Sequence, residues 1–324
     1  MTTTHHPEYP VDRAAMAPIR LALGSAKGSI DGPGARKAFD EIMGHVPAAP
    51  GVTYAAATVG GVSGWWCRPE KALQCAAILY FHGGGYVVGA SQAYQHFAGQ
   101  VAAHAKAAAF VPDYRLAPEH PFPAAVEDAQ AIYEGLVAEG FTNIALAGDS
   151  AGGGLALIIL SWAAAKARAG SGPAPKGAAV MSPWTDLALA GESMVTRAKA
   201  DPLSTPVQLA TMARLYLASR DPHDPLASPL YGDLAGLPPV RMHVGEDDVL
   251  LDDSVRYGER FEREGGTIQV HTWQGMIHVF PSNVALLKAA KEALDDIGDF
   301  LNRQLLDEPV AIAACDARQK KGPV

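Results

Sequence analysis

One short stretch, Gly148-Asp149-Ser150-Ala151-Gly152-Gly153, constrains the fold of this chain more than any other. It follows an apolar run at 143–147, which predicts a buried strand, and it precedes another at 154–160, which predicts a packed helix. A serine at the tip of so tight a turn must adopt a strained backbone conformation, so its neighbours have to be small. The stretch is therefore typical of a nucleophile elbow, in which the serine hydroxyl projects from the sheet toward the helix N-terminus.

Strands and helices alternate along most of the remaining chain. An antiparallel pair is predicted around Gly60-Gly61, because residues 52–59 and 62–68 have a period near two. The further predicted strands are 76–81, 107–112, 143–147, 177–181, 240–244 and 267–273, and the predicted helices between and after them are 91–105, 123–139, 154–160, 253–264 and 284–305. This alternation predicts an α/β fold with a mostly parallel central sheet that is covered by helices on both faces.

Two regions interrupt the alternation. Residues 11–46 carry two helical patterns, and residues 183–238 carry one helical pattern among many turn signals. We expect N-terminal cap helices over 1–48 and a catalytic domain over 49–324, of which 185–235 contributes to the cap. The alternative for the N-terminal helices is ordinary packing against the main body.

A serine hydroxyl is a poor nucleophile until a base removes its proton, so the chain should also supply a histidine and an orienting acid. Ligands of parallel sheets bind at the carboxyl ends of the strands, and the loops there are the places to search. His278 lies on the loop after the last predicted strand and is the candidate general base. By contrast, His243 and His271 fall inside predicted strands, and His96 and His104 fall inside a predicted helix.

The loop after the preceding predicted strand is rich in carboxylates. One of them should accept the Nδ1–H of the imidazole and hold the ring in its reactive tautomer. Asp248 is the best candidate for this orienting acid, and Glu246 and Asp247 are the alternatives. Asp252 and Asp253 lie where the next helix begins, so we expect them to cap that helix and to interact with its dipole.

A glycine-rich loop supplies candidate donors for an oxyanion. The strand that ends at Phe81 runs directly into His82-Gly83-Gly84-Gly85. Because glycine backbone can approach a ligand closely, we assign the N–H groups of Gly83 and Gly84 as donors, together with that of Ala151. His82 is expected to brace this loop rather than to perform chemistry.

These motifs together resemble those of one known family. His82-Gly83-Gly84-Gly85 and Gly148-Asp149-Ser150-Ala151-Gly152 are similar to motifs of the bacterial hormone-sensitive-lipase-like esterases of the α/β-hydrolase superfamily, and so are the segments 113–119 and 122–128. The order Ser150, Asp248, His278 is also that of α/β-hydrolases. The likeness extends from about residue 52 to residue 300.

The chain departs from the family pattern at two places. The family string Asp-Pro-Leu-x-Asp is Asp248-Val249-Leu250-Leu251-Asp252 here, so valine replaces proline and the loop is expected to be less rigid. The family's His-Gly-Phe is His278-Val279-Phe280, which adds bulk beside the base.

The resemblance implies an α/β-hydrolase fold with a helical cap, no cofactor, and hydrolysis of carboxylic esters with short to medium acyl chains through an acyl-serine. The residues that adjoin the catalytic loops are candidates for pocket walls, with plain core positions as the alternative: Tyr86, Trp184, Leu250, Val279 and Phe280. A lactone hydrolase, for example of monoterpene lactones, or an amidase would use the same triad. A catalytically inactive binding protein is the alternative from another class, and the complete set of motifs argues against it.

The composition excludes several other classes of protein. With 48% hydrophobic and 19% charged residues, the chain is too apolar for disorder, and its net charge of −8 argues against nucleic acid and anionic membranes as partners. No apolar run approaches the roughly 20 residues that span a bilayer. The expected partner is a small-molecule ester or lactone, and a homodimer is the one assembly that we allow.

The cysteines indicate a compartment. Cys67, Cys75 and Cys315 are an odd number at spacings that do not suit a metal, and we interpret them as free thiols of a reducing compartment. Residues 1–10 are polar and lack the apolar segment of a signal peptide. These features together predict a cytoplasmic protein with no metal site.

Overall fold

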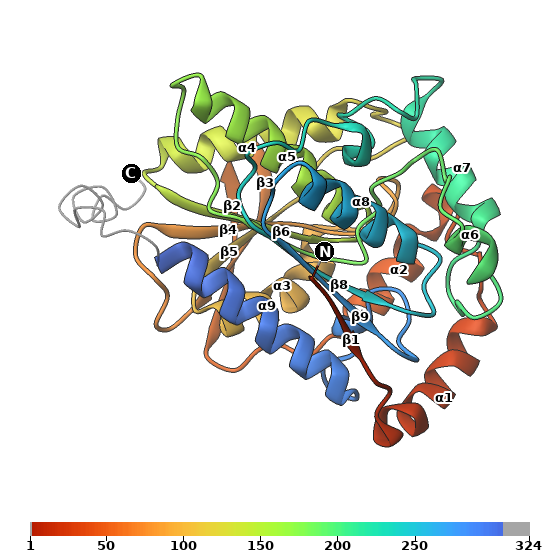
Figure 1. The fold of residues 1–324 in the computed structure, drawn as a ribbon. Helices are drawn as coiled ribbons and strands as arrows, with labels where there is room; N and C mark the ends of the chain where they lie inside the picture. Colours follow the sequence, from red (N-terminus) through yellow and green to blue (C-terminus); the bar gives the residue numbers. More distant parts are fainter. Residues whose placement is uncertain (1, 307–324) are drawn as a thin grey trace.

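A nine-stranded sheet crosses the middle of the chain in a computed structural model that describes residues 2–306 (Figure 1). The strands are β1 Thr2–His6, β2 Val52–Val59, β3 Val62–Pro69, β4 Ala76–Phe81, β5 Ala108–Pro112, β6 Asn143–Asp149, β7 Ala178–Met181, β8 Val240–Gly245 and β9 Ile268–Trp273. Their order is β1-β9-β8-β7-β6-β4-β5-β3-β2. The pairs β2–β3 and β3–β5 are antiparallel and the other neighbours are parallel, so the predicted α/β class is confirmed.

Helices cover both faces of the sheet. The helices α3 Ser91–Ala105 and α9 Lys288–Leu306 lie on one face, and α4 Ala124–Ala138, α5 Ser150–Arg168 and α8 Leu251–Arg263 lie on the other (Figure 1). Along β4, Leu79 and Phe81 join the core on the α5 side, whereas Ile78 and Tyr80 join the core on the α3 side. Because both faces are buried, this strand is a continuous apolar run rather than an alternating one.

The two segments that were expected to form a cap lie side by side. The helices α1 Pro10–Gly24 and α2 Arg36–Met43 gather with α6 Ser193–Thr196 and α7 Pro206–Leu217 at one side of the sheet, on the right of Figure 1. Backbone hydrogen bonding joins them, since the Gly28 N–H donates to the Leu203 carbonyl at 3.0 Å. The amide of Gln208 also donates to the Ile30 carbonyl at 2.6 Å. This arrangement places α1 and α2 over the same edge of the sheet as the inserted segment.

The first strand was not expected. Residues 2–6 were assigned to the cap helices of 1–48, but they form β1, which pairs in parallel with β9 at the edge of the sheet. The ring of His6 stacks on Trp273 with 3.7 Å between centroids, and His6 Nε2 lies 2.8 Å from His271 Nδ1. The residues of β1 are polar, so contacts of this kind with β9, rather than burial of apolar side chains, hold the strand in the sheet.

His6, His243, His271, Arg241 and Asp296 form what we call the histidine cluster. Trp273 Nε1 donates to His243 Nδ1 at 3.1 Å, so the Nε2–H of His243 donates to Asp296 at 2.9 Å. Arg241 donates to His271 Nε2 at 2.9 Å, so the Nδ1–H of His271 donates to His6. Each of the three histidines accepts a hydrogen bond on one ring nitrogen, so all three are neutral rings.

We expect acid to destabilise the protein through this cluster. Burial lowers the pKa of His6 and His243 and lowers that of His271 to about 3, from an ordinary value of 6.5. The folded state thus binds fewer protons than the unfolded chain between these two values, and the free energy of unfolding should fall as the pH is lowered through this window. Urea unfolding at several pH values would measure the slope, and His271→Gln should reduce it by up to about 1 kcal/mol per pH unit. An unchanged slope in that variant would contradict the prediction.

The structure differs from two expectations, one about apolar runs and one about the cysteines. Contrary to the expectation that no apolar run is long enough to span a bilayer, the helix α5 is long and apolar enough by length and composition, but 72% of its apolar window is buried inside the fold. Cys67 is a buried free thiol, and burial raises its pKa to about 12. Cys75 is disulfide-bonded, so its interpretation as a free thiol was wrong, and Cys315 lies outside the described residues.

Candidate active site

Ser150 occupies the sharp turn between β6 and α5. Its φ is +52°, a conformation that non-glycine residues rarely adopt. A Cβ on Gly152 would lie 2.1 Å from the Phe81 carbonyl oxygen, and one on Gly148 would lie 2.5 Å from the Gly152 carbonyl oxygen. The small residues around the serine are therefore required by contact with neighbouring backbone, as the elbow predicts.

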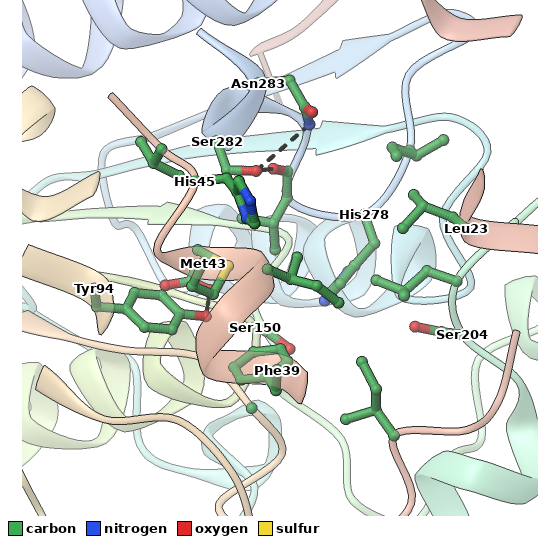
Figure 2. A pocket seen from close by; sticks show the side chains of 18 of the residues that line it. Leu23, Phe39, Met43, His45, Tyr94, Ser150, Ser204, His278, Ser282 and Asn283 are labelled. Carbon is green, nitrogen blue, oxygen red and sulfur yellow. Dashed lines mark hydrogen bonds between the residues drawn. The ribbon is translucent and has the colours of Figure 1, made fainter. Parts of the chain in front are cut away.

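His278 and Asp248 come together from the loops after β9 and β8. His278 Nδ1 lies 2.9 Å from Asp248 Oδ2, and the other carboxylate oxygen accepts the Leu250 N–H at 2.8 Å. A carboxylate only accepts, so Nδ1 carries the proton and Nε2 is left to act as a base. Figure 2 shows His278 and Ser150 pointing toward one another at the base of a pocket.

The surroundings of His278 favour its charged form. Burial lowers the pKa of the ring, but the hydrogen-bonded Asp248 and the nearby carboxylates of Asp201 and Asp149 outweigh burial and raise it to about 9. The site thus stabilises the imidazolium that forms when His278 takes a proton.

The glycine loop differs from the prediction by one residue. The Gly83 N–H donates to Asp149 Oδ1 at 3.2 Å, so the assignment of Gly83 as an oxyanion donor was wrong. Gly84 and Gly85 line the pocket at φ +110° and +62°, and among the described residues their N–H groups have no hydrogen-bond acceptor. Ala151 lies in the first turn of α5, where N–H groups have no partner within their own helix. The N–H groups of Gly84, Gly85 and Ala151 are the ones free for an oxyanion.

Asp149 is a functional residue that the sequence did not suggest. Its carboxylate is fully buried and accepts hydrogen bonds from Tyr80 at 2.8 Å and Tyr94 at 3.2 Å in addition to that from Gly83. Burial raises its pKa to about 6. Asp149 therefore ties the elbow to the glycine loop, and the only signal for this in the sequence is a carboxylate inside a turn of small residues.

The contacts of His82 hold the glycine loop in place. Its ring stacks on Tyr114 with 4.3 Å between centroids, and the Tyr114 hydroxyl donates to the His82 carbonyl at 2.7 Å. Its own Nδ1–H donates to the Gly83 carbonyl at 2.8 Å. Burial lowers its pKa to about 4, so the ring is neutral and fixed beneath the glycine loop.

The other carboxylates of the acid loop have structural roles. Asp247 forms an ion pair with Arg20 of α1. Asp252 and Asp253 were expected to cap α8 and to interact with its dipole; the N-cap is Leu250 and neither side chain caps the helix, but both lie in its first turn, where a negative charge suits the dipole. They accept backbone N–H groups of the inserted segment instead, Asp252 from Ser193 at 2.8 Å and Asp253 from Thr185 at 2.8 Å.

The pocket above Ser150 has a volume of about 280 Å³ and mostly apolar walls. The N-terminal helices contribute Leu23, Phe39 and Met43 to its walls (Figure 2), and further wall residues come from α7 and from the segment after β9. Of the candidate wall residues, Val279 lines the pocket. The other four are buried outside its lining, which corrects the prediction for Tyr86, Trp184, Leu250 and Phe280. The N-terminal helices, expected as a cap, supply wall residues that were not named individually from the sequence.

One group of side chains among the described residues could reach a common metal ion, namely His243, His271 and Asp296 of the histidine cluster. The guanidinium of Arg241 lies 2.9 Å from His271 Nε2 and 2.7 Å from Asp296 Oδ1. A cation already stands beside these atoms, so the group is suited to hydrogen bonding rather than to a metal.

Comparison with known proteins gives consistent relatives. A family model described as the alpha/beta hydrolase fold matches residues 78–282. An acetyl-hydrolase of Streptomyces hygroscopicus is 39% identical over 271 residues, which cover 82% of this chain and 88% of that protein. An esterase of Acinetobacter venetianus is 32% identical over 275 residues, which cover 84% of this chain and 89% of that protein.

Solved structures agree with these relatives. The esterase EstE5 superposes with a TM-score of 0.83 at 36% identity, over 92% of this chain and 99% of that chain. An esterase described as a member of the bacterial hormone-sensitive lipase family superposes with a TM-score of 0.79 at 38% identity, over 83% of this chain and 90% of that chain.

Proposed function

The chain belongs to the bacterial hormone-sensitive-lipase-like esterases of the α/β-hydrolase family and hydrolyses carboxylic esters, and we propose that Ser150, His278 and Asp248 perform this reaction on short- to medium-chain acyl esters. The observation that carries the residue assignment is the 2.9 Å contact between His278 Nδ1 and Asp248 Oδ2 beneath a pocket that also contains Ser150. The apolar walls of that pocket suit an uncharged acyl or alcohol group.

The mechanism follows from this geometry. Ser150 Oγ attacks the ester carbonyl while His278 Nε2 takes the hydroxyl proton, and Asp248 keeps the ring in the required tautomer. The N–H groups of Gly84, Gly85 and Ala151 stabilise the oxyanion, and each such donor contributes about 10²-fold or more to the rate. The imidazolium returns its proton to the departing alcohol, and water activated by His278 then releases the acid from the acyl-serine.

A series of p-nitrophenyl esters tests the substrate range. We expect kcat/KM to rise roughly fourfold for each added methylene while the chain still fits the pocket, since each buried methylene contributes about 0.8 kcal/mol. It should fall again once the acyl chain exceeds the pocket of about 280 Å³. A steady rise to long-chain esters would contradict the proposal, and a lactone turned over faster than any of these esters would favour the lactone hydrolase instead.

We further propose that the enzyme is soluble, on the burial of α5 in the fold and on the likeness to solved esterases. The expected cytoplasmic location depended partly on free thiols, and the disulfide at Cys75 removes that support. Fractionation of the native cells, followed by assay of each fraction, would assign the compartment.

A further inference from the structure

A second buried aspartate reaches the acid loop from the cap segment. Asp201 lies between α6 and α7 and is fully buried. Its Oδ1 accepts the N–H groups of Leu203 and Ser204, each at 2.8 Å, as in an ordinary Asp turn. Its Oδ2 makes a further hydrogen bond that the turn does not require, since it accepts the N–H of Val249 at 3.1 Å.

The Val249 N–H is present because this chain departs from the family string. Val249 follows Asp248 directly, at the position where the family string has proline. A proline has no N–H, so valine is what allows a hydrogen bond from Asp201 to the residue beside the catalytic acid. One carboxylate therefore links the inserted segment to the loop that orients His278.

Three carboxylates from three different elements raise the pKa of His278. Asp248 comes from the loop after β8, Asp201 from the inserted segment and Asp149 from the end of β6, and all three act on the imidazole. Burial and the neighbouring Asp248 raise the pKa of Asp201, while the N–H groups of Leu203 and Ser204 oppose them and favour its charged form.

Two cations, Lys27 and Arg20, bind the backbone around Asp201. The ammonium of Lys27 donates to the backbone carbonyls of Ala198 and Asp201. Arg20 donates to the Asp247 carboxylate and to the carbonyls of Ala200 and Gly275. Among the described residues neither cation makes a hydrogen bond or ion pair with the Asp201 carboxylate, so its negative charge is left to act on His278.

We propose that Asp201 is a positioning residue of the ester hydrolase: it holds the loop that carries Asp248 through the Val249 N–H, and it places a second negative charge beside the His278–Asp248 pair. This inference rests on the proposed roles of His278 and Asp248. The charge stabilises the imidazolium, so the pH at which His278 becomes a free base should be set partly by Asp201.

The test is the pH dependence of kcat/KM for p-nitrophenyl butyrate. Hydrolysis needs neutral His278, so activity should rise with pH until it passes the pKa of His278, which is raised to about 9. The variant Asp201→Asn keeps the shape of the side chain, removes its charge and replaces one acceptor oxygen by an amide donor. We expect this rise in activity to occur at a pH lower by about one unit, the small end of what a neighbouring charge produces.

Two further variants separate charge from hydrogen bonding. Val249→Pro removes the donor but keeps every carboxylate, so we expect kcat to fall several-fold while the rise stays within about 0.3 pH unit of its wild-type position. Asp253→Asn is a matched control, because Asp253 is also buried and accepts two backbone N–H groups from the inserted segment. It does not act on His278, so the profile of this variant should stay in place.

The proposal would be overturned if Asp201→Asn folds and lowers kcat without moving the pH profile, since that is the behaviour of a turn residue alone. An NMR titration of the His278 ring gives a readout that needs no activity. A wild-type His278 pKa near the ordinary 6.5 would overturn the proposal even if Asp201→Asn does not fold. If the wild type had no esterase activity, the proposed function would be refuted, and the titration would still test the effect of Asp201 on the pKa of His278.

Discussion

Replacement of Ser150 by alanine is expected to lower kcat for ester hydrolysis by about 10⁶-fold, as loss of the nucleophile does in other serine hydrolases. Ser150 is the residue that the elbow holds at φ +52°, at the base of the pocket that His278 also lines. Without its hydroxyl no acyl-enzyme can form, and the oxyanion donors alone would leave only weak catalysis of direct attack by water.

The measurement is steady-state hydrolysis of p-nitrophenyl butyrate, with mass spectrometry of the enzyme after a serine-directed sulfonyl fluoride. Wild type should gain one adduct on Ser150, and Ser150→Ala should gain none. Ser161→Ala is the control, because Ser161 lies on the same helix and its hydroxyl donates only to the Leu157 carbonyl at 3.3 Å. Full activity in Ser150→Ala would refute the nucleophile, and a wild type inactive on every ester and lactone would favour the binding protein.

The sequence predicted the parts of the site that depend on local order along the chain. An elbow needs a strand, small residues and a helix in succession, and these are visible between 143 and 160. His278 and Asp248 could be found because loops after neighbouring parallel strands meet at one edge of the sheet. Both the mostly parallel sheet and its antiparallel pair followed from changes in hydrophobic period.

The features that were missed depend on contacts between distant parts of the chain. The predicted oxyanion donors were wrong by one residue, because the Asp149 carboxylate accepts the N–H of Gly83. Gly84 and Gly85 are the glycines that line the pocket. The strand β1 is polar and is held by stacking of His6 on Trp273. In the sequence Asp201 begins one of three Asp-Pro pairs, and its proximity to Val249 appears only after folding.

Asp248→Asn is expected to lower kcat by about 10⁴-fold. An asparagine amide can donate to Nδ1 and would then favour the tautomer that leaves a proton on Nε2, where the base must be free. Asp247→Asn should change kcat by less than about threefold, because Asp247 forms an ion pair with Arg20 and does not touch His278. Equal losses in the two variants would refute Asp248 as the orienting acid.

The pH dependence separates this effect from that of Asp201. Both substitutions remove a negative charge that raises the pKa of His278, so both should move the rise in activity to lower pH. In Asp201→Asn the ring keeps its hydrogen bond to Asp248, so at high pH kcat should fall no further than the several-fold loss expected for Val249→Pro. In Asp248→Asn the tautomer itself is wrong, and no increase in pH corrects a tautomer, so the loss should persist at every pH. A variant of Asp248 that recovers in alkali would show that its charge, and not its orientation of the ring, is what the reaction uses.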